Sequence, residues 1–375
     1  MITKQLLFLT LLSLLISCKT SNKKEKSKRI TSIAYAKGFN IQEYKFFKKL
    51  TIHTSFKGDT EARDYYLIQK GYRIPDSLTE KNIVFVPIKR MVVTSTTHIP
   101  MLEILGVEST LVGFPNTKYI SSEKTRILIE SGKVQELGQE QNINTELLID
   151  LEPELVVGFG VNNTSPVFKN IEKMGIPVIM NSDWLEQTPL GKAEWLKFFG
   201  ALYQKDSVAN VKFNEIANNY NTIKNKLENV SKKPTVLSGS LYQDVWYLPA
   251  GESFVAKFLE DAYTDYLWKD TKGTGSLSLS LESVLDKGQY AEFWIAPGFY
   301  SSKKSMLEDS PHYKEFDAYK TGNLYTYALT KGKTGGVIYF ELATARPDLV
   351  LQDLVSIFHP TVFPNVERSF FKNLK

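Results

Sequence analysis

A long amphipathic helix near the middle of the chain constrains the fold more than any other sequence feature. Its apolar residues recur at alternating spacings of four and three, and they are Ala209, Phe213, Ile216, Tyr220, Ile223, Leu227 and Val230. This spacing places them on one stripe of a helix whose other faces are polar. A continuous helix over residues 206–230 would be about 35 Å long. Such a helix either crosses one large domain or connects two lobes, and its flanks decide between these.

The residues before this helix predict an α/β lobe with a parallel sheet. Short apolar strands are expected at residues 91–95, 111–114, 155–159 and 177–180, with helical segments between them. This alternation is typical of parallel sheets, whose ligands bind beyond the carboxyl ends of the strands. Residues that follow the strands are therefore expected at one edge of the lobe, in the ranges 95–98, 114–119, 158–162 and 181–184.

The same alternation resumes after the helix. Strands are predicted at residues 235–238 and 293–296, and helices at residues 254–261 and 347–358. The fold class is therefore α/β, with two Rossmann-like lobes that contain parallel sheets and are joined by one long connecting helix. We divide the chain into an N-terminal lobe (89–187), linker helices (188–230) and a C-terminal lobe (234–375). The facing loop edges of the two lobes are expected to form a cleft.

A β-rich extension is predicted before the first lobe, over residues 31–88. Aromatic and β-branched residues are concentrated at residues 33–39, 44–53, 65–68 and 83–86, with Gly, Asp and Pro between these segments. These segments are predicted to be strands. The sequence does not indicate what the extension does.

A weak internal repeat places one acidic residue at matching positions of the two lobes. Glu146 and Glu282 each lie two residues after a plausible helix cap, which is Asn144 in the first lobe and Ser280 in the second. An acid in the first turn of a helix is favoured by the helix dipole and needs no partner. Because the position occurs once in each lobe, we also consider it a candidate surface site.

The sequence contains no recognisable catalytic or metal-binding arrangement. Gly158-Phe-Gly160 lacks the third glycine of a dinucleotide-binding motif, and the four histidines are scattered. The net charge of +5 is modest, and many lysines are in one N-terminal run, so no nucleic-acid-binding face is indicated. We predict that the protein is not an enzyme, has no metal site of its own and holds no covalently bound cofactor.

Large aromatic rings near predicted strand ends suggest a pocket for a bulky ligand. The candidate cleft residues from this argument are Ser95, Thr96, His98, Phe114, Phe159, Asn162, Trp184, Tyr242, Trp246, Trp268 and Phe299. Two alternatives remain open. Trp246 and Trp268 could belong to the core of the second lobe, and His98 could be a structural residue.

The N-terminus resembles a bacterial lipoprotein signal. An apolar run over residues 6–16 follows Lys4 and leads into Leu15-Ile16-Ser17-Cys18, which resembles a lipobox. Residues 1–18 are then the signal peptide, Cys18 is the lipidated residue, and residues 19–30 are a disordered tether. The alternative is an ordinary signal peptide with an unrelated cysteine. Lys19 and the absence of a following acidic run favour an exported protein anchored at the periplasmic face of the inner membrane of a diderm host.

Several motifs in order resemble one family. They are the lipobox, Arg90-Met-Val-Val-Thr-Ser-Thr-Thr-His-Ile-Pro, Leu111-Val-Gly113, the run from Asn144 to Val157, and Pro189-Leu-Gly-Lys-Ala-Glu-Trp195. Together they are similar to the substrate-binding lipoproteins of ABC importers for iron-siderophores, haem and cobalamin. The resemblance implies a shallow cleft, little hinge closure, and one exposed glutamate on each lobe that docks on permease arginines. By position these are Glu146 and Glu282.

The resemblance leaves the ligand open. It implies a monomer whose partners are an ABC permease, indirectly its ATPase, a metal chelate, and the membrane through the lipid anchor. An iron-siderophore is the favoured ligand. Haem binders of the family use a tyrosine in the loop that contains Tyr119, catecholate binders use cleft arginines, for which Arg346 and Arg126 are candidates, and cobalamin is a further alternative. From another class, a lipid-anchored chelate-processing or interaction protein could use the same scaffold.

Overall fold

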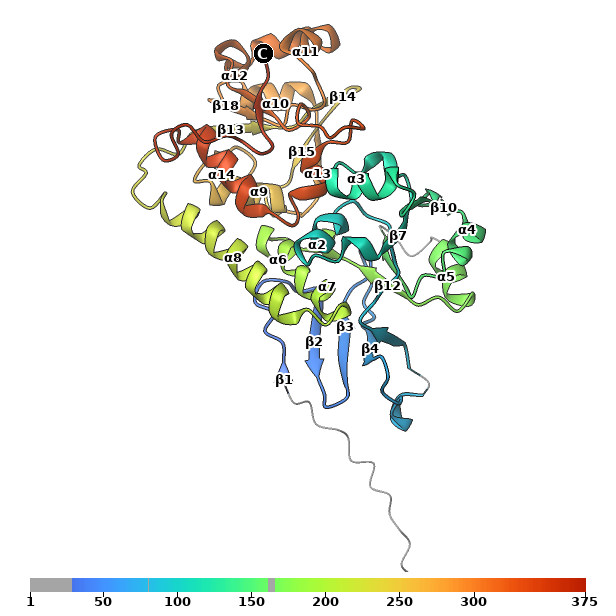
Figure 1. The fold of residues 1–375 in the computed structure, drawn as a ribbon. Coiled ribbons are helices and arrows are strands. Elements are labelled where there is room, and N and C mark those ends of the chain that lie inside the picture. The colour runs from blue at the N-terminus through green and yellow to red at the C-terminus, as the bar shows by residue number, and fades with distance from the viewer. Residues whose placement is uncertain (1–28, 80, 161–165) are drawn as a thin grey trace, which may run out of the picture.

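The computed structural model describes residues 29–79, 81–160 and 166–375. The predicted signal peptide (1–18) with Cys18, residues 19–28 of the predicted tether, and Asn162 lie outside this part of the chain. The last two residues of the predicted disordered tether, Arg29 and Ile30, form a short strand instead. Figure 1 shows two α/β lobes, linker helices between them, and an N-terminal sheet beside the linker. The predicted fold class is therefore confirmed.

A five-stranded parallel sheet forms the centre of the N-terminal lobe. The strand order is β12-β11-β6-β7-β8, and every neighbouring pair is parallel. The strands are β6 (Met91–Val93), β7 (Leu111–Phe114), β8 (Gln135–Glu136), β11 (Leu155–Phe159) and β12 (Val178–Asn181). The α-helices and remaining strands are α2 (His98–Ile104), α3 (Glu123–Glu130), β9 (Gly138–Gln139), β10 (Asn142–Ile143), α4 (Thr145–Asp150) and α5 (Pro166–Lys173). All residues of β6 and β7 are buried, as expected for a sheet covered on both faces.

The C-terminal lobe contains a second five-stranded sheet in the order β16-β13-β18-β19-β20, parallel except for its last pair. The strands are β13 (Thr235–Ser238), β16 (Asp265–Tyr266), β18 (Phe293–Ile295), β19 (Leu324–Thr326) and β20 (Lys372–Asn373). A smaller antiparallel sheet consists of β14 (Ser240–Tyr242), β15 (Val245–Pro249) and β17 (Ser276–Leu279). The helices are α9 (Phe254–Asp261), α10 (Leu281–Gly288), α11 (Lys303–Asp309), α12 (Asp317–Thr321), α13 (Ile338–Leu342) and α14 (Pro347–Phe358).

Three helices form the linker, and they are α6 (Pro189–Glu194), α7 (Leu196–Leu202) and α8 (Asp206–Asn225). The 20 residues of α8 span about 30 Å. The predicted helix over residues 206–230 is therefore too long at its C-terminal end. Beyond α8 the chain continues in turns, in which the Leu227 and Val230 N–H groups bond to carbonyls only three residues back. The predicted apolar stripe is nevertheless buried from Ala209 to Leu227.

The N-terminal extension is a five-stranded sheet whose strands follow chain order. They are β1 (Arg29–Ile30), β2 (Phe39–Glu43), β3 (Phe47–Ile52), β4 (Arg63–Gln69) and β5 (Ile83–Val86). Pairing is antiparallel except between β4 and β5. In Figure 1 this sheet lies at the lower end of the molecule, below α7.

Most of the segment before β2 is not a strand, contrary to the prediction for residues 33–39. The N–H groups of residues 34–36 donate to the carboxylate of Glu194 at 2.6–3.0 Å. Those of residues 37–38 donate to Glu186 at 2.8–3.0 Å. Because these donors are satisfied by two linker-side carboxylates, they need no neighbouring strand. Glu194 therefore fastens the extension to the linker, and Glu186 fastens it to the segment just before the linker.

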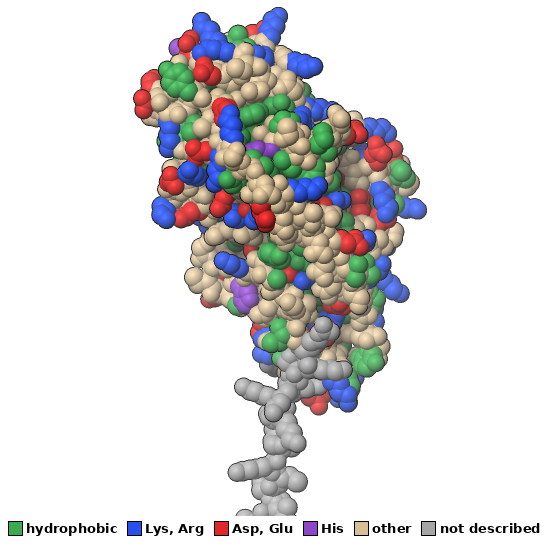
Figure 2. Space-filling view, turned by 90° about the vertical axis from the view of Figure 1, so that its left-hand side faces the viewer, with side chains coloured by type: hydrophobic (Ala, Val, Ile, Leu, Met, Phe, Trp, Pro, Cys, Tyr) green, Lys and Arg blue, Asp and Glu red, His purple; other side chains and the backbone are tan. Residues whose placement is uncertain are grey.

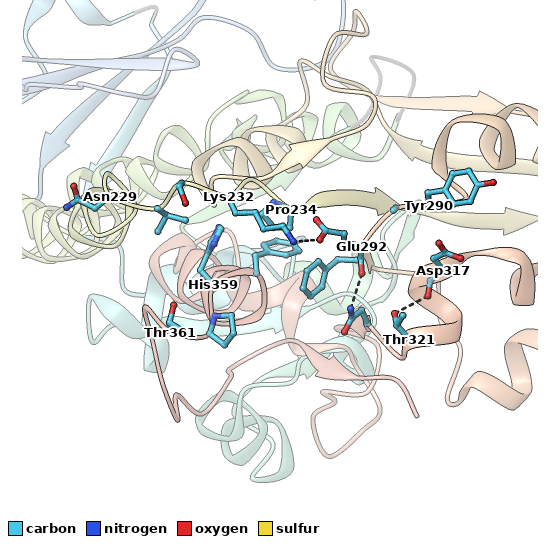
Figure 3. Close-up of a pocket in the computed structure, with 16 residues that line it drawn as sticks. Asn229, Lys232, Pro234, Tyr290, Glu292, Asp317, Thr321, His359 and Thr361 are labelled. Carbon is cyan, nitrogen blue, oxygen red and sulfur yellow. Dashed lines mark hydrogen bonds and ion pairs between the residues drawn. The ribbon is translucent and has the colours of Figure 1, made fainter.

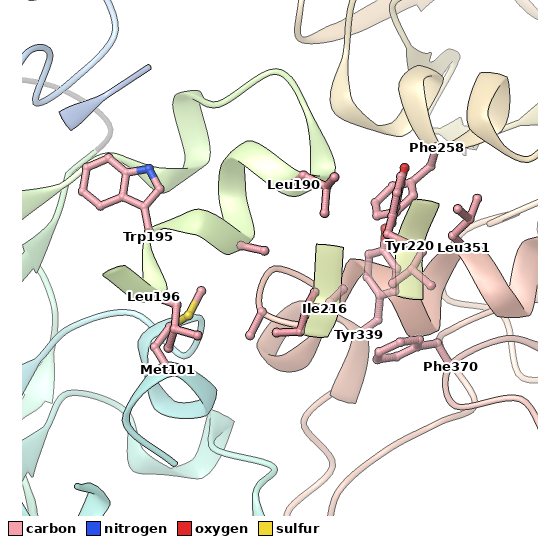
Figure 4. Close-up of a cluster of buried hydrophobic side chains, with 14 of the residues drawn as sticks. Met101, Leu190, Trp195, Leu196, Ile216, Tyr220, Phe258, Tyr339, Leu351 and Phe370 are labelled. Atoms are coloured by element: carbon pink, nitrogen blue, oxygen red, sulfur yellow. The ribbon is translucent and has the colours of Figure 1, made fainter. Parts of the chain in front are cut away.

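One hydrophobic core runs through the extension, the linker and both lobes. It includes Phe39 of the extension, Met91 of the N-terminal sheet, Trp195 of α7's cap and Trp294 of the C-terminal sheet. Figure 4 shows its central part, where linker and C-terminal side chains lie together, among them Leu190, Ile216, Tyr220, Phe258 and Leu351. Close-packed contacts of this kind resist deformation. The linker thus joins the two lobes through continuous buried packing.

The outer surface carries both signs of charge. On the face drawn in Figure 2, lysine and arginine side chains are interspersed with aspartate and glutamate. Among the described residues, none of the helices is both long and apolar enough to cross a membrane.

Candidate functional site

Three adjoining hollows lie where the two lobes meet, and residues of both lobes line the first two, while the third is lined by the C-terminal lobe alone. Their volumes are about 510, 310 and 230 Å³. Phe340 of α13 lines all three, and the first two share Ser95, Thr96 and Phe159. We call the three together the interlobe cleft and the largest one the main hollow.

The N-terminal wall of the cleft consists of residues that follow the parallel strands. Ser95 and Thr96 follow β6, and Phe159 ends β11. Trp184 follows β12, and its ring centroid lies 6.2 Å from that of Phe159 at an interplanar angle of 56°. Neighbouring parallel strands bring their carboxyl ends to one edge of the sheet. The edge predicted from the sequence therefore lines the interlobe cleft.

The second hollow contains Phe114 and Tyr119. Tyr119 is 54% exposed. Glu140 faces the same hollow and accepts a hydrogen bond from the Thr94 hydroxyl at 3.1 Å, and burial raises the pKa of its carboxyl. This hollow combines an aromatic surface with a phenol and a carboxyl group.

The C-terminal wall is aromatic. Phe254 and Phe258 come from α9, and Tyr339 and Phe340 come from α13. The Tyr327 ring stacks on Tyr339 with centroids 4.5 Å apart and meets Phe340 edge-on at 5.3 Å. The rings of α13 are thus fixed from behind by aromatic packing.

Sequence reasoning missed these residues of the C-terminal wall. Helix α13 has only five residues, too few for a periodic pattern. The only available signal was the adjacent aromatic pair at 339–340, shortly after two glycines at 335–336.

A buried polar cluster lines the main hollow. The Lys192 amine donates to the backbone carbonyls of Asp183 and Trp184, each at 3.1 Å, and lies 4.5 Å from the centroid of the Phe254 ring. The Asp183 carboxylate accepts from the Thr97 hydroxyl at 3.2 Å. Burial lowers the pKa of Lys192 and raises that of Asp183. The Trp184 indole N–H is buried and has no hydrogen-bond partner among the described residues.

The lobes also touch beside the cleft. Glu341 of α13 accepts hydrogen bonds from the backbone N–H groups of Ser121 at 2.6 Å and Ser122 at 2.8 Å, which precede α3 in the other lobe. Its side chain is buried. Burial raises the pKa of Glu341 to about 7, and the Glu103 carboxylate adds to the rise. Helix α13 therefore carries two cleft rings and an interlobe hydrogen-bond acceptor side by side.

Two predicted cleft tryptophans lie in the C-terminal core instead. Trp246 is fully buried, stacks on Trp294 at 5.2 Å, and donates to the Ser238 carbonyl at 3.0 Å. Trp268 is 5% exposed and belongs to the same core. Side chains alternate along β15, and Trp246 is on its buried face. The placement of these two rings in the cleft was wrong.

His98 and Arg346 also lie outside the cleft lining. His98 is fully buried, its ring lies 5.4 Å from that of Phe199, and burial lowers its pKa to about 3. Arg346 donates two hydrogen bonds to the Asp348 carboxylate at 2.8–2.9 Å. Packing on α7 and pairing within the start of α14 explain these two residues, so their prediction as cleft residues was wrong.

Tyr242 and Phe299 are each 69% exposed and do not line the three hollows. Tyr242 ends β14. The Phe299 ring centroid is 6.0 Å from that of Phe340, so Phe299 lies near the cleft rim.

The two repeat-related glutamates lie on exposed first turns. Glu146 is in the first turn of α4, and Glu282 is in the first turn of α10. The predicted caps are confirmed, since the Asn144 side chain accepts from the Leu147 N–H and the Ser280 hydroxyl accepts from the Ser283 N–H. Hydrogen bonds from its own backbone and from Ser280 lower the pKa of Glu282.

A separate hollow of about 750 Å³ lies at the opposite edge of the C-terminal sheet (Figure 3). It is lined by residues that precede β13, β18 and β19, including the Lys232–Glu292 ion pair. No predicted cleft residue lines it, and the amino ends of parallel strands are not where such sheets bind ligands. We therefore take the interlobe cleft as the candidate site.

Comparison with known proteins agrees with this architecture. Residues 91–329 match the periplasmic binding protein family. The chain belongs to this family. The match covers both lobes up to β19 and leaves the extension and α13 outside.

Proteins similar to this periplasmic binding protein include an uncharacterised lipoprotein and two proteins of known structure. An uncharacterised lipoprotein of Methanocaldococcus jannaschii is 27% identical, over 94% of this chain and 88% of its own length. A periplasmic haem binding protein of Pseudomonas aeruginosa aligns with a TM-score of 0.59 and 17% identity, over 77% of this chain and 98% of that one. A Fe3+-hydroxamate transport system protein of Saccharomonospora viridis aligns at 0.53 and 15% identity, over 73% and 94%. At this identity the two structures support the fold alone.

The described residues of this periplasmic binding protein contain no group of three or more His, Cys, Asp or Glu side chains that could hold a metal ion. Its cleft instead presents aromatic surfaces with a few polar groups, and such a surface suits an organic molecule better than a bare metal ion.

Proposed function

We propose that this protein is the substrate-binding component of an ABC importer and that it captures a metal chelate, namely an iron-siderophore, in the interlobe cleft. The observation that carries the proposal is an aromatic cleft between two lobes that share one buried core, in a periplasmic binding protein. Binding rests on ring contacts and a few hydrogen bonds, without covalent chemistry. Lipidation of Cys18 anchors the exported protein to the membrane, and Glu146 and Glu282 dock on the permease.

The ligand class in this proposal is taken from the descriptions of two proteins with the same fold. Their descriptions name haem and ferric hydroxamate, which are both metals enclosed by an organic ligand. Native mass spectrometry of the protein purified from its own host, with its ligand retained, identifies the chelate. If the purified protein retains haem, and if its tyrosinate absorbance is lost in Tyr119→Phe, the ligand is haem and not an iron-siderophore.

Phe340→Ala is expected to weaken binding of the retained chelate by about 10- to 100-fold, because Phe340 lines all three hollows. Quenching of tryptophan fluorescence during titration with the chelate measures the affinity. Phe85→Ala is the matched control, since Phe85 on the extension sheet is 43% exposed and Phe340 is 47% exposed. Equal affinities of both variants and wild type would exclude the cleft as the binding site.

Combined replacement of Glu146 and Glu282 by alanine is expected to reduce uptake of the chelate by at least about tenfold, because docking loses both charged contacts. Chelate binding by the purified variant should stay unchanged. Uptake of radiolabelled iron chelate by cells that carry each variant measures the effect. Glu123→Ala combined with Glu308→Ala removes two other exposed acids and serves as the control. Undiminished uptake in the Glu146/Glu282 variant contradicts the importer function.

A further inference from the structure

The extension sheet contributes to the main hollow. The loop between β3 and β4 carries Lys57, which lines this hollow together with Trp184 and Gln187. Lys57 thus brings one side chain of the extension to the cleft, from a part of the chain that lies outside the region matched by the family.

The loop that presents Lys57 is held by its own hydrogen bonds. The Asp59 carboxylate accepts from the N–H groups of Ser55 at 3.1 Å and Glu61 at 3.2 Å, and it pairs with Arg63 at 2.7 Å. The Arg63 guanidinium also donates to the Ser55 hydroxyl at 2.5 Å. These bonds close the loop on itself, so the backbone that carries Lys57 is ordered before any ligand binds, while the exposed side chain can adjust to the ligand.

Lys57 differs from the other lysine of the main hollow. The Lys192 amine is buried and already occupied by two carbonyls and the Phe254 ring. Lys57 is exposed and makes no hydrogen bond or ion pair with any described residue. It is the free cation among the described residues that line the three hollows.

The remaining charges of the cleft are negative. Asp183 and Glu186 line the main hollow, and Glu140 lines the second. The carboxylate of Glu186 is already bound by the N–H groups of residues 37–38 and the Trp195 indole. No arginine lines the hollows among the described residues. The described lining of the hollows thus contains three carboxyl groups and two amines, of which Lys57 is the one without a partner, so a ligand with several negative charges would find few cationic partners there.

We propose that Lys57 is a specificity-determining residue that selects metal chelates bearing a single peripheral anionic group, such as a carboxylate, and that the cleft disfavours polyanionic chelates. This inference rests on the proposed function. A charge-assisted hydrogen bond from Lys57 would orient the chelate, while the aromatic walls hold its apolar body.

One linear trihydroxamate provides matched probes. Its terminal amine can be left free, acetylated or succinylated, so that the ferric complex carries one positive charge, none, or one negative charge with otherwise similar shape. A ferric tris-catecholate, with three negative charges, is the polyanionic probe. Affinities are measured by tryptophan fluorescence quenching with wild type, Lys57→Gln and the control Lys81→Gln, whose lysine is exposed beside β5 in the same sheet.

Wild type is expected to bind the succinylated complex most tightly and the tris-catecholate most weakly. Lys57→Gln should lose about five- to tenfold in affinity for the succinylated complex and less than about twofold for the acetylated one. Lys81→Gln should match wild type. Three outcomes would overturn the inference and leave the proposed function standing. Wild type could bind all three trihydroxamates with equal affinity, or it could bind the tris-catecholate most tightly. Lys57→Gln could also lose the same affinity for all three trihydroxamates. Failure of wild type to bind any of the four ferric complexes would overturn both.

Discussion

Replacing Glu194 with alanine is expected to lower the free energy of unfolding by about 3–5 kcal/mol. The Glu194 side chain is fully buried, pairs with Lys197 at 2.7 Å and accepts the N–H groups of residues 34–36. Its removal leaves a buried ammonium and several backbone donors without their acceptor, and each such loss is costly. Guanidinium unfolding measures the change. Hydrogen exchange at residues 34–36 should also accelerate, since these amides lose their partner.

Glu215→Ala is the matched control for this variant. Glu215 on α8 also pairs with a lysine three residues away, Lys212, but both side chains are about half exposed. Surface pairs of this kind contribute less than about 1 kcal/mol. If Glu194→Ala were as stable as Glu215→Ala, the carboxylate would not fasten the extension to the linker.

Wild type is expected to lose stability relative to Glu341→Gln as the pH rises from about 5 to about 8. Burial raises the pKa of Glu341 to about 7 in the folded protein. An exposed glutamate in the unfolded chain has a pKa of about 4.3. The folded state therefore binds the proton more tightly between these values. The contribution of the protonated Glu341 carboxyl to the free energy of unfolding is fully present below the unfolded pKa. It is lost as the pH rises through about 7, and the total loss is on the order of 3 kcal/mol.

Glutamine cannot titrate, so the pH dependence of the difference between wild type and Glu341→Gln isolates this carboxyl group. Unfolding by guanidinium at a series of pH values measures it. Glu130→Gln is the control across the same interface, because Glu130 pairs with Lys333 at 2.8 Å and this bond lowers its pKa. Its effect should be small and of opposite sign. A pH-independent difference for Glu341→Gln would contradict burial as the dominant influence.

The parts of the fold with local signals were predictable. The bounds of α14 follow from Pro347 in its first turn, and those of β13 follow from a short apolar run after Pro234. Residues 33–38 were mispredicted because their hydrogen-bond acceptors, Glu186 and Glu194, lie about 150 positions later in the chain. No local pattern can report such distant partners.

The site was predictable on one side only. The N-terminal wall follows from a topological rule about parallel strands, which needs only the strand positions. The C-terminal wall depends on α13 and α9, and the burial of Trp246 depends on Trp294 and other rings far away in sequence. A ring at a strand end can face either the core or the cleft, and only the packed structure decides between them.

The single core that crosses the linker also limits how relatives of this protein could exchange parts. If two related sequences were recombined within or beside α8, the apolar face of α8 from one protein would pack against α14 from the other. The core side chains would then no longer fit together. Chimeras that aim to transfer ligand preference should therefore exchange surface loops, such as the one between β3 and β4, and keep the linker together with both lobes from one parent.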